Sequence, residues 1–156
     1  MEPSREQQRV SRSASFTLAA TRSVVFPLFG PDREGDWAAD WNPEPVYPPY
    51  IAAEERAVFK TYHSEEAIWV MTRLVPEEGM VQYTTFRAND RVGQITVRVS
   101  EAGSGSHVEV TYTFTALSDR GRKHIAHFTE RHYREMIAEW EGAISHFLET
   151  GQTLQG

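Results

Sequence analysis

Much of the fold of this chain is decided by one stretch, FPLFGPDREGDWAADWNPEPVYPPY, residues 26 to 50. It holds six of the eight prolines and six of the 18 aromatic residues, including two tryptophans. Proline and glycine interrupt it too often for one long helix or one strand, although each uninterrupted piece supports a helix of about two turns. The stretch therefore predicts two short helices followed by an extended segment that the prolines keep stiff.

The residues on both sides of this stretch alternate apolar and polar side chains, as strands with one buried face do. Upstream, residues 14 to 21 show this alternation and predict a first strand. Downstream, five runs separated by turn residues predict an antiparallel meander: AVFKTYH, AIWVMTRLV, MVQYTTFR, VGQITVRVS and HVEVTYTFTAL. The sequence thus predicts a sheet of about six to seven strands.

After the last of these runs, the spacing of apolar residues changes to that of a helix. We expect one uninterrupted helix over residues 119 to 149, which Gly151 is placed to end. This helix is long enough to pack across the whole sheet, and we expect Trp140 and Phe147 to be buried there. The predicted apolar positions are Ile125, Phe128, Met136, Trp140, Ile144 and Phe147.

The length of the chain suits a single domain. A folded chain of 156 residues buries about 70% of the surface that its unfolded form exposes, which allows a substantial core. No internal repeat or change in composition divides it, so we expect one domain over residues 13 to 150. Residues 1 to 12 are polar without an apolar period and predict a flexible tail. Residues 151 to 156 predict a shorter C-terminal tail.

The composition argues against several classes of protein. A formal net charge of -6 does not suit a protein that binds nucleic-acid phosphates through a continuous basic surface. The chain has no cysteine, which excludes disulfide bonds, thiol catalysis and thiolate metal sites. It has no apolar run of membrane-spanning length and no signal-peptide core, so we expect a cytoplasmic protein without membrane insertion. We expect a monomer or a homodimer.

The block around Pro31, Glu34, Trp37 and Trp41 is the most distinctive part of the chain, and VFKTYH, IWVMTRL and VTYTFTALSDRG accompany it. Together with the order of the predicted elements, it resembles the SRPBCC superfamily of START and Bet v 1-like proteins. Within that superfamily it is similar to bacterial proteins grouped with polyketide cyclases and lipid-transport proteins. The resemblance extends over about residues 13 to 150.

This resemblance implies an α+β helix-grip fold, in which a curved antiparallel sheet wraps around a long C-terminal helix. It also implies an internal apolar cavity between the sheet and the helix. It implies no particular catalytic residue, because the superfamily contains binding proteins, carriers and enzymes on one fold.

The expected cavity would be lined mainly by aromatic side chains from the sheet, the long helix and the proline-rich stretch. Trp37 and Trp41 are four residues apart, so one helical turn would place both rings on the same side. There they would either form a lid over the cavity or anchor the short helices to the sheet. The predicted ligand-binding residues are Trp37, Trp41, Phe59, Trp69, Arg73, Tyr83, Tyr112, Phe114, Phe128, His132, Met136 and Trp140.

Two of these residues are ionisable, and each has two interpretations. His132 falls on the predicted apolar stripe of the helix, where it is either a hydrogen-bonded core histidine or a polar contact for a ligand. Arg73 shares a face with Trp69 if the strand alternates regularly, and it would then need a carboxylate such as Glu34. Otherwise Arg73 lies on the outer face of the sheet.

The sequence predicts no metal and no cofactor. His124, His127 and His132 lie within nine residues, but they do not match an accepted spacing of metal ligands. No serine-nucleophile or phosphate-loop motif is present either. The catalytic residues, if the protein is an enzyme, are therefore unknown at this stage.

Three functions are compatible with these patterns. The first is binding of a small hydrophobic or amphipathic molecule in the cavity, as a carrier or sensor. The second is a polyketide cyclase or dehydratase-like enzyme, in which His132 or a tyrosine transfers a proton. The third is a protein-interaction module with a filled interior. A large cavity would favour the first two functions, and a packed interior would favour the third.

Overall fold

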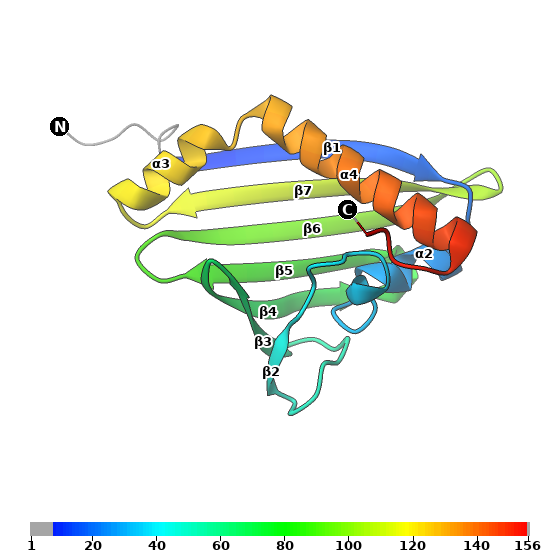
Figure 1. Cartoon of the computed structure of the whole chain (residues 1–156), viewed down its shortest axis with the longest axis horizontal. Helices are drawn as coiled ribbons and strands as arrows, with labels where there is room; N and C mark the ends of the chain where they lie inside the picture. The colour runs from blue at the N-terminus through cyan, green and yellow to red at the C-terminus, as the bar shows by residue number, and fades with distance from the viewer. Residues whose placement is uncertain (1–7, 156) are drawn as a thin grey trace.

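The structure, a computed structural model, describes residues 8 to 155 and contains a seven-stranded antiparallel sheet (Figure 1). The strands lie in the order β1-β7-β6-β5-β4-β3-β2, with a long helix across one face. The predicted helix-grip architecture is therefore confirmed. The strands are β1 (Arg9–Leu18), β2 (Glu44–Tyr47), β3 (Val58–His63), β4 (Glu65–Val75), β5 (Met80–Arg87), β6 (Arg91–Ala102) and β7 (Gly105–Ala116).

Strand β1 begins earlier than the sequence predicted. Residues 9 to 12, which we expected in a flexible tail, pair with β7 in continuous antiparallel register. On the outer face, Ser11 Oγ lies 2.9 Å from Thr113 Oγ1, and the equivalent pair formed by Ser13 and Thr111 is 2.7 Å apart. These polar cross-strand pairs stabilise the strand without apolar side chains. The first seven residues of the expected tail lie outside the described residues.

The proline-rich stretch forms the short helices that its interruptions predicted. Helix α2 (Arg22–Val25) leads directly into the 3-10 turn η1 (Phe26–Phe29), and η2 (Glu34–Asp36) follows. The chain then forms β2, which is the edge strand next to β3. Pro45 is tolerated in β2 because an edge strand needs backbone donors on one side only.

The C-terminal helix is divided in two, so the prediction of one helix over residues 119 to 149 is wrong. Helix α3 (Asp119–His127) ends at Phe128, and α4 (Glu130–Thr150) begins after Thr129. The Thr129 hydroxyl caps α4 by accepting a hydrogen bond from the backbone N–H of His132 (3.2 Å). The break lets Phe128 bury its ring on the sheet, and Gly151 ends α4 as predicted.

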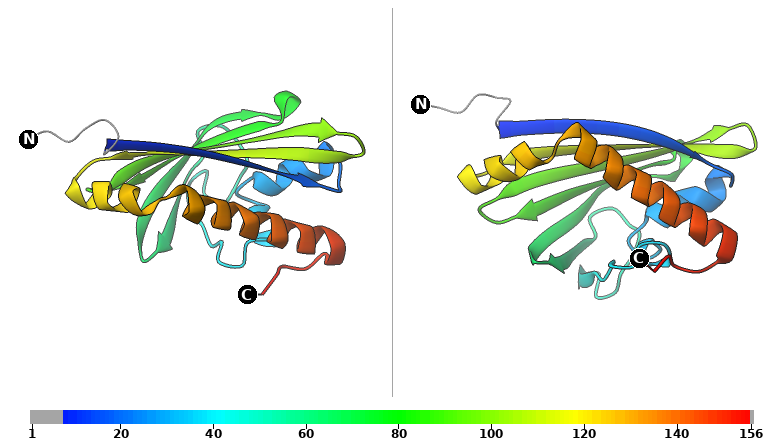
Figure 2. Two further views of the ribbon diagram at one scale, coloured as in Figure 1. Left: turned by 90° about the horizontal axis from the view of Figure 1, so that it is seen from above. Right: turned by 45° about the horizontal axis from the view of Figure 1, so that its top comes forward.

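Helices α3 and α4 lie on the same face of the sheet, and α4 crosses the strands diagonally (Figure 2). Tyr133, Ile137 and Ile144 form the side of α4 that is buried against the sheet, and the Tyr133 hydroxyl donates to the carbonyl oxygen of Val110. Trp140, which we expected to be buried, is only partly so, as is Phe147. None of the described helices has the length and apolar character of a membrane span.

Candidate functional site

A small cavity lies between the inner face of the sheet, α4 and the lid segment, our name for residues 26 to 41. Its volume is about 20 Å³, enough for one group the size of a water molecule. Typical small-molecule pockets measure about 300 to 1,000 Å³, so the interior is nearly filled as it stands. The residues that line the cavity are Phe29, Glu34, Trp69, Tyr83, Ile95, Val97, Tyr112 and Trp140.

Four strands and two other segments bring these residues together. Tyr83, Ile95 and Tyr112 are direct neighbours across β5, β6 and β7, and they form a row on the inner face of the sheet. Trp140 reaches this row from α4, with its ring centroid 6.2 Å from that of Tyr112. The lid segment supplies the opposite wall with Phe29 and Glu34.

Four of the 12 residues predicted to bind a ligand line this cavity, namely Trp69, Tyr83, Tyr112 and Trp140. Six others pack nearby without lining it, because neighbouring rings cover them or because they lie further along the inner face. These six are Trp37, Trp41, Phe59, Phe114, Phe128 and Met136. The remaining two, Arg73 and His132, are exposed.

The positions of Arg73 and His132 correct the sequence-based expectations. Arg73 follows a bulge in β4, where the pairing with β5 shifts between Met71 and Arg73, so regular alternation does not apply to it. His132 lies one residue before the buried Tyr133, which places it about 100° around α4 from the face that packs on the sheet. His132 therefore does not border the cavity, and Glu34 is not a partner of Arg73.

The carboxyl group that faces the cavity belongs to the half-buried Glu34, which the sequence indicates only as part of the distinctive block and as a possible partner for Arg73. Burial raises the pKa of its carboxyl group to about 8, and no neighbouring charge or hydrogen bond opposes the effect. Burial also raises the pKa of Tyr83 and Tyr112, with the nearby Glu34 contributing to both. At neutral pH, Glu34 is thus mainly a neutral acid that can donate and accept a hydrogen bond.

The lid segment is held by four side chains that donate hydrogen bonds to its backbone, one of them Thr153, whose hydroxyl donates to the carbonyl of Asp36 (2.8 Å). Trp37 Nε1 donates to the carbonyl of Leu28 (2.7 Å), and the Tyr83 hydroxyl donates to that of Phe29 (2.6 Å). Trp41 Nε1 donates to the carbonyl of Pro31 (2.8 Å). These bonds satisfy carbonyl groups that have no helical partner. The two tryptophans therefore anchor the segment.

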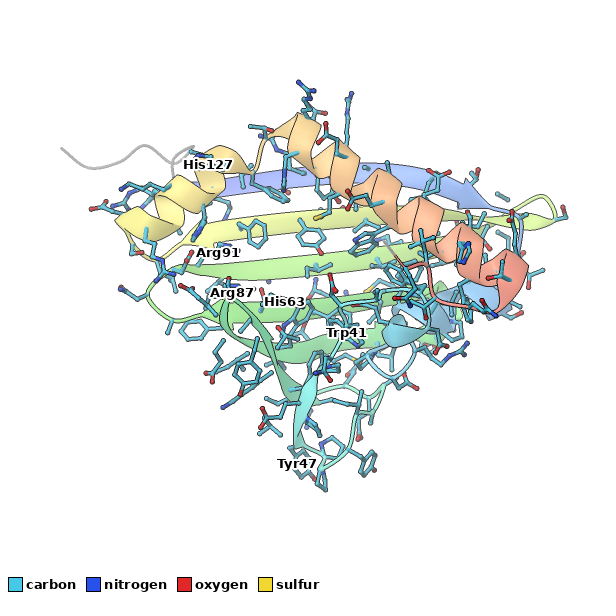
Figure 3. The ribbon with its side chains drawn as sticks, in the orientation of Figure 1. Trp41, Tyr47, His63, Arg87, Arg91 and His127 are labelled. Atoms are coloured by element: carbon cyan, nitrogen blue, oxygen red, sulfur yellow. The ribbon has the colours of Figure 1, made fainter. Side chains whose placement is uncertain are left out.

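The two anchors attach the lid segment to different parts of the fold. The Trp37 ring lies against Trp140 of α4, with 5.4 Å between the ring centroids. Trp41 instead packs edge-on against Phe59 and Trp69 of the sheet, at 5.7 and 5.5 Å (Figure 3). The short helices are consequently fixed to both layers that enclose the cavity.

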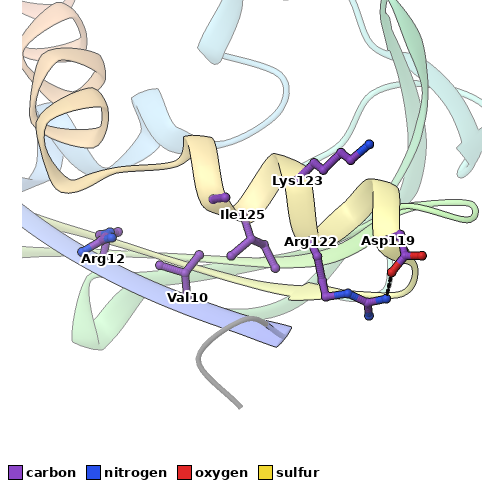
Figure 4. Close-up of a pocket in the computed structure, with 7 residues that line it drawn as sticks. Val10, Arg12, Asp119, Arg122, Lys123 and Ile125 are labelled. Atoms are coloured by element: carbon purple, nitrogen blue, oxygen red, sulfur yellow. Dashed lines mark hydrogen bonds and ion pairs between the residues drawn. The ribbon is translucent and has the colours of Figure 1, made fainter. Parts of the chain in front are cut away.

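Larger depressions lie outside this cavity, and two of them border the lid segment and α3. One, of about 360 Å³, lies on the outer side of the lid segment and is lined by Phe26, Pro27, Gly30, Asp32, Arg33, Ala53, Leu74, Pro76 and Val81. The other, of about 640 Å³, is an open gap between β1 and α3, where Arg122 pairs with Asp119 (Figure 4). Its wall is formed by Val10, Arg12, Asp119, Arg122, Lys123, Ile125 and Ala126.

At the α3 end of the sheet, a second carboxyl group is fully buried and has very different surroundings. Asp90, in the turn between β5 and β6, has no exposed side-chain surface, and its carboxylate contacts Arg91 (2.9 Å) and His124 (2.8 Å). Arg120 lies 3.5 Å from it and also pairs with Glu65. We call these five residues the ionic cluster. It connects α3 to two hairpins of the sheet.

Burial alone would raise the pKa of Asp90, but hydrogen bonds from His124 and Arg91 outweigh burial and lower it. The close approach of α3 to this turn requires Gly121, because a Cβ atom there would collide with the carbonyl oxygen of Asp90. Among residues 8 to 155, no group of three or more histidine or carboxylate side chains is arranged to hold a metal ion.

Comparison with solved structures identifies the fold. The chain superimposes on Ara h 8.0201 with a TM-score of 0.66 and 14% identity, covering 91% of this chain and 99% of that one. The chain therefore has the Bet v 1-like, or SRPBCC, fold. CalU16 from Micromonospora echinospora gives a TM-score of 0.62 with 16% identity, over 86% of this chain and 76% of that one.

A norcoclaurine synthase from Thalictrum flavum gives a TM-score of 0.67 with 10% identity, over 92% of this chain and 97% of that one. No family model matches the chain, and neither does any curated protein. At these identities the likeness concerns the fold, and the chemistry of the site has to be argued from this chain's own residues.

Proposed function

We propose that the protein binds a small, largely apolar molecule between the sheet and α4, with Glu34 as its hydrogen-bonding partner. The observation that carries this proposal is a carboxyl group among five aromatic side chains, without a protein partner within residues 8 to 155. Glu34 is half-buried, and a polar group that loses water without gaining a partner costs free energy. A ligand that hydrogen-bonds to Glu34 would recover part of that cost.

Binding requires the lid segment to move, because the cavity itself holds only a water-sized group. Phe29 and Glu34 face the cavity, whereas Gly30, Asp32 and Arg33 face the outer cleft of about 360 Å³. The wall between the two spaces is thus a single stretch of chain. Displacement of residues 29 to 34 would join them into a site of the size that small molecules occupy.

The comparisons support a ligand of this kind. A norcoclaurine synthase structure of the same fold contains dopamine and hydroxybenzaldehyde, two small aromatic molecules with polar groups. The aromatic wall formed by Trp69, Tyr112 and Trp140 suits such rings. We propose an aromatic or similarly flat ligand for this chain on the basis of that wall.

A second candidate function is catalysis of the cyclase or dehydratase type, and the state of Glu34 favours it. A carboxylic acid with a pKa of about 8 can donate a proton at neutral pH and take it back. Conversely, the nearly filled interior favours the third candidate, an interaction module. The experiment below separates these functions.

The test combines two measurements. Native mass spectrometry of protein purified from its own host identifies a retained ligand or product. Fluorescence titration with N-phenyl-1-naphthylamine, a neutral aromatic amine, then compares the wild type with Glu34→Leu and with Glu135→Leu on the exposed side of α4.

We expect the probe to bind the wild type and Glu135→Leu equally. Glu34→Leu should bind it about 5- to 10-fold more weakly, which corresponds to one lost hydrogen bond. No retained molecule and no probe binding would support the interaction module instead. A retained mixture of substrate and product would support the enzyme.

A further inference from the structure

Two arginines lie on the inner face of the sheet at the end opposite Glu34. Arg87 ends β5 and Arg91 begins β6, and the two are paired directly across the hairpin (Figure 3). Side chains along a strand point alternately to the two faces of the sheet. Arg87 therefore shares the inner face with the buried Tyr83 and Thr85 of β5. Arg91 lies on the same face as the buried Gly93 of β6. Both guanidinium groups are therefore near the apolar surface that the proposed ligand would occupy.

The charge of Arg91 is already neutralised by protein. Its Nη1 atom lies 2.9 Å from the carboxylate of Asp90 and 3.2 Å from Nδ1 of His124. Its guanidinium carbon also lies 5.0 Å from the ring centroid of Phe114, a cation–π contact on the inner face. Arg91 is thus fixed in place and marks the edge of the apolar surface.

Arg87 is different, because its charge has no carboxylate partner within residues 8 to 155. Its recorded hydrogen bond goes to the backbone carbonyl of Glu65, at 3.3 Å. The side chain is half-buried, and burial lowers the pKa of its guanidinium; the charge of Arg91 adds to this effect and the charge of Asp90 opposes it. An arginine nevertheless stays protonated, so a partly desolvated positive charge remains.

The carboxylates nearest to Arg87 are engaged elsewhere. Asp90 is shared by Arg91, Arg120 and His124, and Glu65 pairs with Arg120. This end of the inner face consequently has three guanidinium groups, those of Arg87, Arg91 and Arg120. They face only two carboxylates, Asp90 and Glu65, although the net charge of the chain is -6. The local excess of positive charge is suited to an anionic group supplied by a ligand.

We infer that Arg87 binds the anionic group of an apolar organic anion, a carboxylate or sulfonate, whose body lies on the inner face beside Phe114. Arg87 lies four residues beyond Tyr83 on the same strand, about 13 Å from the cavity at Glu34. A ligand of that length would contact a neutral acid at one end and a guanidinium at the other. This inference deepens the proposed function and rests on it.

The test uses two fluorescent probes that share an N-phenylnaphthylamine body. 1-Anilinonaphthalene-8-sulfonate is anionic, and N-phenyl-1-naphthylamine is its neutral counterpart. Each is titrated against the full-length wild type, Arg87→Gln and Arg87→Lys. Arg98→Gln is the matched control, because Arg98 is exposed on the outer face of β6. Thermal unfolding of each variant verifies that it is folded.

We expect Arg87→Gln to bind the sulfonate about 10-fold more weakly and the neutral probe within twofold of the wild type, since one charge-assisted hydrogen bond is removed. Arg87→Lys should retain most of the difference in affinity between the two probes. Arg98→Gln should leave that difference unchanged. If Arg87→Gln weakens the binding of both probes equally, or of neither, the proposed anion site is wrong. The proposed apolar site would not be affected by that result. If neither probe binds the wild type, the proposed function and the anion site are both wrong.

Discussion

The two ends of the inner face each contain a carboxyl group withdrawn from water, half-buried in Glu34 and fully buried in Asp90, and the two groups are in opposite states. Glu34, at the lid segment, is surrounded by aromatic rings, and burial raises its pKa to about 8. Asp90, in the ionic cluster, contacts Arg91 and His124, and these hydrogen bonds lower its pKa below the usual value in spite of burial. Burial favours the neutral acid in both cases, so the partners decide which form exists.

This difference separates a group that holds the structure together from a group available to a ligand. The charge of Asp90 is paired with Arg91, Arg120 and His124, which connect α3 to the sheet, although its Oδ2 atom accepts no hydrogen bond of good geometry. Glu34 retains its hydrogen-bonding capacity, because nothing within residues 8 to 155 uses it. The predictions below test this contrast from the largest expected effect to the smallest.

The largest effect is expected from Asp90→Asn, which removes the charge from the ionic cluster. Loss of one partner from a buried ion pair leaves the remaining charges uncompensated, and we expect the free energy of unfolding to fall by about 3 to 5 kcal/mol. Urea denaturation measures this change. Glu135→Gln is the control, because its pair with Arg131 is exposed and should contribute less than about 1 kcal/mol. Equal effects of the two substitutions would contradict the structural role of Asp90.

The second prediction concerns pH, and the two carboxyl groups should act with opposite signs. The folded-state pKa of Glu34 is raised from 4.5 to about 8, so between these values the folded protein binds more protons than the unfolded chain. Stability should therefore decrease as the pH rises from 5 to 8, by at most about 3.5 kcal/mol from this group. The pKa of Asp90 is lowered from 3.8, so its contribution is present at pH 5 and is lost in more acidic solution.

Glu34→Gln isolates the effect of Glu34, because the amide is neutral at every pH in this range. Unfolding free energies measured at pH 5, 6, 7 and 8 should decline less steeply in the variant than in the wild type. Parallel curves would mean that Glu34 is ionised or exposed to solvent, and the candidate site would lose its defining group.

A smaller effect is expected from Tyr83→Phe, which removes one hydrogen bond to the lid segment and keeps the ring. The carbonyl of Phe29 then loses its donor, so we expect about 1 to 2 kcal/mol of lost stability. Amide hydrogen exchange should become faster in residues 28 to 34 and remain unchanged in the ionic cluster. Tyr50→Phe, at an exposed tyrosine, should change neither quantity. Faster exchange throughout the protein would argue against an independent lid segment.

The smallest effect is expected from Thr129→Ala, at the break between α3 and α4 that separates the two ends. Loss of the hydroxyl that caps α4 should cost about 1 kcal/mol. Differential scanning calorimetry of this variant and of Thr17→Ala, on the outer face of β1, would measure it. No difference between the two variants would indicate that the burial of Phe128, rather than the cap, determines the break.

Several features could be predicted from the sequence because they follow from local chemistry. The strands after residue 50 bury the side chains of one face more than those of the other, most clearly in β6, and the sheet could be recognised from that period. Proline and glycine permit only short helices between residues 22 and 36, whatever surrounds them. The resemblance to the Bet v 1-like fold added the order of these elements in space.

Other features depend on contacts between distant segments. The start of β1 depends on hydrogen bonds from Ser11 and Ser13 to β7. These bonds are polar, so the spacing of apolar residues does not predict them. The chain at Thr129 could continue as one helix or divide into two. The capping of α4 by Thr129 and the burial of Phe128 together favour two helices. His132 was misplaced for this reason, since starting α4 at a new point sets which of its residues face the sheet.

The sequence by itself determined the class of fold and about a third of the cavity-lining residues that it named. Only the tertiary structure decided the role of Glu34, which lies in a charged, turn-like segment that looks exposed when read along the chain. Its chemistry depends on rings contributed by Trp69, Tyr112 and Trp140, from three separate elements. The physical reason is that a carboxyl group's pKa is set by everything around it in space, whereas a strand's alternation is set by its own neighbours in the chain.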